Sequence, residues 1–149
     1  MKALVTMVAL MCVPSTAFAQ QLDLTLSSPV ITFPGSDPDT VPIVAAAPVQ
    51  VSYRVRQNNK GTWSLTVLAA GDLISGPARI DISNVTWVAT PAPPFQNGTL
   101  SKTVAQRVAS GTDNVNPLTV GSITFRLANS WTYSTGTYTQ TVLFTLSAP

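Results

Sequence analysis

The most constraining feature of this sequence is the alternation of apolar and polar residues in short runs. In residues 49–56, three valines and Tyr53 alternate with Gln50, Ser52 and two arginines. Successive side chains of a β-strand point to opposite faces, so such a run buries one face and exposes the other. The pattern recurs in residues 22–26, 63–67, 80–82, 123–127 and 142–146. No segment shows a sustained helical period, so the sequence predicts an all-β chain.

Turn-forming residues separate these runs. Asn58-Asn59-Lys60-Gly61 joins residues 53–57 to 62–68, which predicts a β-hairpin. The Pro-rich stretches 34–48 and 90–98 predict loops or sheet edges, because proline donates no hydrogen bond to a ladder. Short strands at roughly ten-residue spacing are typical of a sandwich, and we expect an immunoglobulin-like antiparallel β-sandwich.

Residues 1–19 have the anatomy of a secretory signal peptide. Lys2 supplies a positive start, residues 3–13 are apolar, and Ala17-Phe18-Ala19 gives the small-x-small pattern before a cut at Gln20. The apolar run is shorter than the about 20 residues of a transmembrane helix. Lipoprotein processing at Cys12 is a rival, although Met11 stands where a small residue is expected.

The signal peptide predicts an exported protein at the cell surface, extracellular or periplasmic, with one β-sandwich domain over residues 20–149. Polar residues interrupt every later apolar stretch, so we expect no membrane span in the mature chain. Cys12 is the only cysteine, and cleavage would remove it, leaving no disulfide. A domain of roughly 130 residues can bury a sufficient core without one.

Composition restricts the chemistry of the mature chain. The sequence has no histidine and no glutamate, which excludes Ser-His-Asp and Cys-His arrangements and ordinary zinc sites. Without Lys2 of the predicted signal peptide, seven Lys and Arg residues stand against six Asp residues, so no strong positive field favours nucleic acid. We predict a protein that is not an enzyme and uses no cofactor. Asp37 and Asp39 are a calcium candidate, against the simpler interpretation of a solvated acidic loop.

Two pairs of side chains are candidate glycan contacts. Arg54 and Arg56 lie two apart on the polar face of one predicted strand, where a basic stripe can face anionic polymers or protect a sheet edge. Trp131 and Tyr133 lie beside Asn129-Ser130 in a polar stretch, and exposed aromatic rings stack on sugars.

Two segments carry a family resemblance. Trp63-Ser64-Leu65 is a Trp-x-Leu triplet after a polar turn, and Phe144-Thr145-Leu146 lies near the end of the chain after Gly136-Thr137-Tyr138. This layout resembles the WxL domain, a bacterial cell-surface module with two such motifs, although the second here has Phe in place of Trp. The resemblance implies non-covalent attachment to cell-wall polymer, with Trp63, Leu65, Phe144 and Leu146 as the motif positions.

A second resemblance leads to a different function. The ending Gly-x-Tyr-x-x-Thr-Val-x-Phe-x-Leu is similar to the last strand of secreted pilin-type and spore-coat-type subunits. In such pilins an N-terminal strand is donated to a neighbour, and residues 21–26 alternate as a donor strand must. They equally suit the first strand of a self-contained sandwich.

The sequence thus leaves two functions open. The first is an exported, non-catalytic module that binds cell-wall polymer, peptidoglycan or an associated glycan, or other surface proteins. The alternative is a pilin-like or coat-like structural subunit that assembles with copies of itself by β-strand donation.

Overall fold

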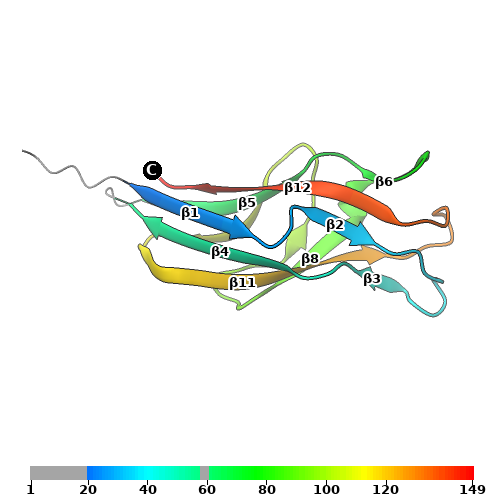
Figure 1. The fold of residues 1–149 in the computed structure, drawn as a ribbon, viewed down its shortest axis with the longest axis horizontal. Coiled ribbons are helices and arrows are strands. Elements are labelled where there is room, and N and C mark those ends of the chain that lie inside the picture. Colours follow the sequence, from blue (N-terminus) through cyan, green and yellow to red (C-terminus); the bar gives the residue numbers. More distant parts are fainter. Residues whose placement is uncertain (1–19, 58–60) are drawn as a thin grey trace, which may run out of the picture.

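The computed structural model describes residues 20–57 and 61–149, and their regular structure is almost entirely β (Figure 1). The predicted signal peptide and residues 58–60 of the predicted hairpin turn lie outside the described residues. In chain order the strands are β1 (Gln21–Leu26), β2 (Val30–Phe33), β3 (Ile43–Ala45), β4 (Val49–Arg56), β5 (Trp63–Ala69), β6 (Leu73–Ser75), β7 (Ala78–Ile80), β8 (Val85–Thr90), β9 (Gly98–Thr99), β10 (Gln106–Gly111), β11 (Val115–Ala128) and β12 (Tyr138–Ser147). One 3-10 turn, η1 (Ile82–Asn84), precedes β8.

The strands form two antiparallel sheets packed face to face. The first sheet has the order β1-β4-β11-β8-β9, and β3 pairs with the end of β11. The second has the order β10-β5-β12-β6-β7, and β2 pairs with the start of β12. The prediction of an all-β sandwich is therefore confirmed at this level. Within the described residues, no helix is long and apolar enough to cross a membrane.

The inward faces follow from the alternation in the sequence. In β4, Val49, Val51, Tyr53 and Val55 are buried, whereas Gln50 and Arg56 are exposed. In β5, every second residue from Trp63 to Ala69 is buried. The Tyr53 ring meets the Trp63 ring across the sandwich at 5.2 Å between centroids, and meets Phe95 edge-on at 5.7 Å. These apolar faces make one continuous core between the sheets.

The predicted hairpin between residues 53–57 and 62–68 is wrong. β4 pairs with β1 and β11, whereas β5 pairs with β10 and β12, so the connection crosses from one sheet to the other. In both strands every second side chain is apolar and buried. Two such apolar faces cover each other when the strands lie in opposite sheets of the sandwich. Sequence spacing alone cannot distinguish this crossing from a hairpin.

The predicted strand at residues 80–82 is also wrong in its second half. β7 ends at Ile80, and the Asp81 side chain accepts a hydrogen bond of 2.9 Å from the Ser83 N–H. This cap starts η1, because a short acidic side chain competes with the ladder for nearby backbone donors. Ile82 nevertheless remains buried.

The first part of the chain changes sheets. β1 pairs with β4 in the first sheet, and β2 pairs with β12 in the second. Residues 27–29 make the crossing: the Ser27 N–H donates to the Gln50 carbonyl at 3.0 Å, and the Pro29 carbonyl accepts from the Val142 N–H at 2.8 Å. The crossing places β1 at an edge of the sandwich beside β12 (Figure 1).

The opposite edge of the sandwich is closed by the Pro-rich stretch before β9. Phe95 bridges to Ala109 of β10, and the Gln96 N–H donates to the Val108 carbonyl at 2.8 Å. The Trp87 Nε1–H donates to the Gln96 carbonyl at 2.9 Å, which ties the same stretch to β8. Residues 91–97 therefore connect the two sheets on this side.

Gly121 gives a direct test of this closure. A Cβ at Gly121 of β11 would lie 2.2 Å from the Cε2 and Cζ atoms of Phe95. We expect Gly121→Ala to lower the free energy of unfolding by about 1–3 kcal/mol, because the Phe95 ring must move within a packed core. Urea denaturation would measure the change.

Gly71→Ala is the matched control, because its Cβ would meet only the Gln140 side-chain amide, at 3.3 Å. In a double variant with Phe95→Leu, the two losses should not add, because the smaller side chain relieves the clash. Additive losses, or equal losses in Gly121→Ala and Gly71→Ala, would contradict this account.

Candidate functional site

The last strand, β12, has an open edge over its final residues. Residues Thr139–Thr141 pair with β2, and residues Val142–Ser147 pair with β5 on the other side. Among the described residues, no strand pairs with Leu143–Ser147 on the side away from β5. We call residues Leu143–Ser147 together with the adjacent β1 the open flank.

Backbone polarity of this edge follows from one hydrogen bond. The Val142 N–H points away from β5, since it donates to the Pro29 carbonyl. Consecutive backbone groups of a strand point to opposite edges. The N–H and C=O groups of Phe144 and Leu146 therefore also point outward, and their edge is a template for a further strand.

Next to this edge, β1 presents an apolar face that is only half covered. Leu22, Leu24 and Leu26 are partly buried and pack against the core, as does Leu146 of β12. Within the part of the chain that the structure describes, β1 pairs with β4 alone, in the register Gln21 to Arg56 through Leu26 to Val51. The open flank is thus a seam of half-buried leucines bordered by unpaired backbone groups.

The predicted basic pair lies in this region, and both of its members have partners within the chain. Arg54 forms an ion pair with Asp23 of β1, with 2.6 Å from its Nε to Asp23 Oδ2. Arg56 donates to the Asn116 side-chain carbonyl at 3.3 Å. The Arg54–Asp23 pair is about one-third exposed, so it adds little to stability.

The structure brings the two resemblance motifs onto neighbouring strands of one sheet. Leu146 is the register partner of Leu65, and Phe144 is that of Val67. Trp63, Leu65 and Phe144 are 2%, 0% and 7% exposed, and Leu146 is half-buried. The Trp63 Nε1–H donates to the Asp113 carbonyl at 2.9 Å. In the folded domain these side chains build the core.

Trp131 and Tyr133 lie at the other end of the sandwich, between β11 and β12. Trp131 is 69% exposed, and its Nε1–H donates to the Asp39 carboxylate at 3.2 Å. Asp37 Oδ1 accepts from the Asp39 N–H at 2.9 Å. The calcium candidate and the aromatic pair are therefore neighbours, which their separation in the sequence did not indicate. Within the described ranges, no three metal-ligating side chains of the His, Cys, Asp and Glu types gather.

A small charge cluster lies apart from these sites. Lys102 Nζ is 2.7 Å from Asp72 and 3.3 Å from Asp81. The hydrogen bond from Lys102, then that from the Ile82 N–H, lowers the pKa of Asp72. Hydrogen bonds from Ser83, then from Lys102, lower the pKa of Asp81 to about 2. These groups hold the ends of β9, β5 and β7 together, and nothing in their arrangement indicates a reaction.

The phenol of Tyr53 is an ionisable group that lies fully inside the core. Burial raises its pKa to about 12, so it stays neutral at any physiological pH. Its oxygen has no hydrogen-bond partner among the described residues. A neutral phenol between two other aromatic rings acts as a core side chain.

Comparison with protein-family models, with curated proteins and with solved structures finds no match to this chain.

Replacing the buried Trp63 and the exposed Trp131 in turn distinguishes a core side chain from a surface side chain. We expect Trp63→Ala to lower the free energy of unfolding by about 3–5 kcal/mol, because it leaves a cavity and strands the Asp113 carbonyl. Trp131→Ala should change it by about 0.5 kcal/mol or less. Denaturant unfolding of the two variants gives the comparison. A Trp63→Ala protein as stable as the parent would show that the motif position is no core anchor.

Proposed function

We propose that this protein is an exported, non-catalytic structural subunit that assembles with copies of itself by β-strand donation at the open flank. The observation that carries this proposal is the edge Leu143–Ser147, which borders half-buried leucines and, among the described residues, has no strand partner on its outer side. Natural proteins cover or charge such edges when they stay monomeric. Here the outward side chain of Leu143 is apolar and 61% exposed.

The strand order supports the finer, immunoglobulin-like arrangement that we include in the proposal. In that fold, one sheet has the order A-B-E-D and the other C-F-G. The order β1-β4-β11-β8 corresponds to the first sheet, and β5-β12 corresponds to C-F. On this correspondence β12 is strand F, and the place of strand G beside Leu143–Ser147 holds no strand of the described residues.

The donated strand is β1 of a neighbouring copy. Its leucines at residues 22, 24 and 26 alternate with polar residues, so one face of the strand is apolar and can cover an apolar seam. β1 has a single partner among the described strands, and residues 27–29 join it to β2. A short connection at the edge of a sheet allows a strand to exchange between identical copies.

The burial of Trp63, Leu65 and Phe144 favours this function over attachment through the WxL-like motifs. A polymer cannot stack on side chains that lie between two sheets, whereas strand pairing uses backbone groups that already point outward. The partner that we propose is therefore a second copy of this chain, outside the cytoplasm, with no cofactor involved.

A disulfide that holds β1 in its own sheet tests strand donation. Thr25 and Ser52 are register partners with side chains outside the core, and they lie in a hydrogen-bonded pair whose Cα separation of about 5.5 Å suits a disulfide. We expect residues 20–149 with Thr25→Cys and Ser52→Cys to stay monomeric when oxidised and to form multimers when reduced. Light scattering after size exclusion would measure the mass.

The matched control is Thr66→Cys with Thr145→Cys, which joins β5 to β12 and leaves β1 free. This variant should assemble in both redox states, as should the parent chain. A synthetic peptide of residues 20–28 should cap the open edge and block growth of parent multimers. Parent protein that remains monomeric at high concentration, or multimers that form despite the oxidised β1 lock, would contradict strand donation.

A further inference from the structure

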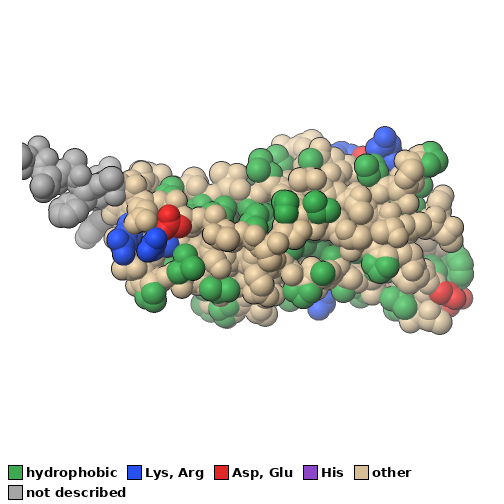
Figure 2. Space-filling model, in the orientation of Figure 1, with side chains coloured by type: hydrophobic (Ala, Val, Ile, Leu, Met, Phe, Trp, Pro, Cys, Tyr) green, Lys and Arg blue, Asp and Glu red, His purple; other side chains and the backbone are tan. Residues whose placement is uncertain are grey.

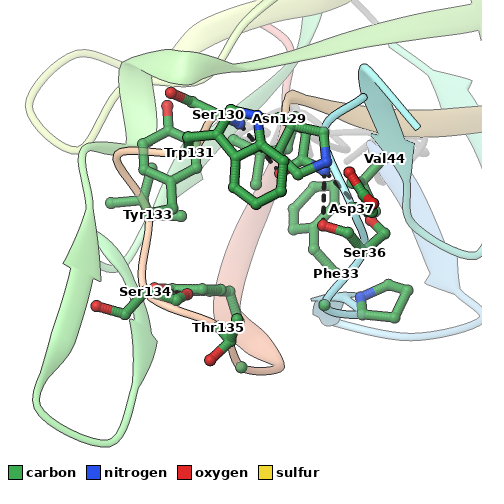
Figure 3. A pocket seen from close by; sticks show the side chains of 17 residues that line it. Phe33, Ser36, Asp37, Val44, Asn129, Ser130, Trp131, Tyr133, Ser134 and Thr135 are labelled. Atoms are coloured by element: carbon green, nitrogen blue, oxygen red, sulfur yellow. Dashed lines mark hydrogen bonds between the residues drawn. The ribbon is translucent and has the colours of Figure 1, made fainter. Parts of the chain in front are cut away.

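The loops between β2 and β3 and between β11 and β12 lie at the end of the sandwich opposite the C-terminus (Figure 1), and they border a cavity of about 520 Å³ (Figure 3). Its volume lies within the range of small-molecule sites. Its floor consists of core side chains from both sheets that are at most 5% exposed: Phe33, Val44, Ile80, Leu127 and Tyr138. Loops 34–42 and 129–137 form its rim.

The rim is held in place by hydrogen bonds within the chain. The Asn129 side-chain amide donates at 3.0 Å to the Ser36 carbonyl (Figure 3). It also donates at 3.0 Å to the Val41 carbonyl, so it joins the two loops. The Tyr133 N–H donates to the Ser130 carbonyl at 3.1 Å, and the Tyr138 hydroxyl donates to the Ser134 carbonyl at 2.8 Å. A rim fixed in this way loses little conformational entropy when a ligand enters.

Two aromatic rings stand on one side of the cavity. Figure 3 shows Trp131 and Tyr133 on this side, with Ser36 and Asp37 on the opposite side and Ser134 and Thr135 below them. The Trp131 indole is held by Asp39 through its Nε1–H, so its ring face remains free although its edge is fixed. Exposing a large apolar ring to water is unfavourable. A ring that is exposed and yet oriented by a hydrogen bond is a suitable platform for a ligand.

Charge restricts the ligand. The side chains that line the cavity include the Asp37 carboxylate and no lysine or arginine. An anionic ligand would meet this carboxylate without a compensating cation. A purely apolar ligand would leave the rim hydroxyls and the carboxylate covered and unpaired, which is costly.

We infer that this cavity binds a neutral carbohydrate, with the C–H face of one sugar ring on Trp131. Hydroxyl groups of the sugar would donate to the Asp37 carboxylate and exchange hydrogen bonds with Ser36, Ser134 and Thr135 at the rim. A sugar ring combines an apolar face with a polar edge, and the cavity offers an apolar floor and aromatic wall beside a polar rim. This binding is independent of the strand donation proposed above.

The experiment is a glycan array of neutral, sialylated and sulfated oligosaccharides probed with the mature chain, followed by calorimetry on each hit. The oxidised Thr25→Cys/Ser52→Cys variant is used, so that assembly does not enter the result. We expect neutral glycans to bind and Trp131→Ala to weaken them about tenfold or more, because a central aromatic platform carries much of the affinity. Val104→Ala, an apolar change at a position that is 61% exposed and lies outside both the cavity and the open flank, should leave binding unchanged.

A second readout covers variants that bind too weakly for calorimetry. Trp63 and Trp87 are buried, so Trp131 is the exposed indole of the described residues. A bound sugar should protect its fluorescence from acrylamide quenching. No neutral glycan bound by the parent, equal affinity in Trp131→Ala, or selective binding of charged glycans or of an apolar dye that sugars do not displace would overturn the inference.

Discussion

The contact between the inner faces of β4 and β5 is the interaction on which the rest of this domain depends. Tyr53 meets Trp63 across the two sheets, and Phe95 packs edge-on against the same tyrosine. Around these rings, the aliphatic side chains of the middle strands are fully buried. Cys12 is the only cysteine of the sequence, so the chain can form no internal disulfide, and its stability rests on this apolar contact and its hydrogen-bonded ladders.

The same core explains why the two edges of the sandwich differ. On one side, Phe95 fills the space above Gly121 and carries residues 91–97 across both sheets. On the other side, β1 alone among the described strands covers the seam, and its leucines remain half exposed. Phe144 illustrates the result, because its ring lies in the core while its backbone groups face outward without a strand partner among the described residues. Covering this edge from within the domain would disrupt a well-packed core, so we expect the edge to pair with another chain instead.

Alternation predicted the strands that carry the core, and it succeeded where each inward position is apolar, as in β4, β5 and the later part of β11. It failed where a local hydrogen bond competes with the ladder, as at Asp81, and where partner choice depends on the whole core, as in the crossing from β4 to β5. The alternation carried no signal of the open flank, since the residues of β12 alternate in the same way whether its outer edge is paired or not. The sequence identified part of the end cavity, because Trp131 and Tyr133 were candidate contacts. It did not indicate that Asp39, about ninety residues earlier, lies beside Trp131 in the folded chain.

The long strand β12 contributes to both proposed activities, glycan binding at its start and strand donation at its end. Its first residue, Tyr138, forms part of the cavity floor, and its last residues form the open flank near the chain termini (Figure 1). The surface view in the same orientation shows apolar side chains scattered along the whole length of this face, with few charges between them (Figure 2). A strand donated at the flank would pair with residues 143–147 and leave loops 34–42 and 129–137 uncovered. Each copy in an assembly would then present its cavity at a free end, so weak individual binding to a repeated glycan would be multiplied by the number of copies.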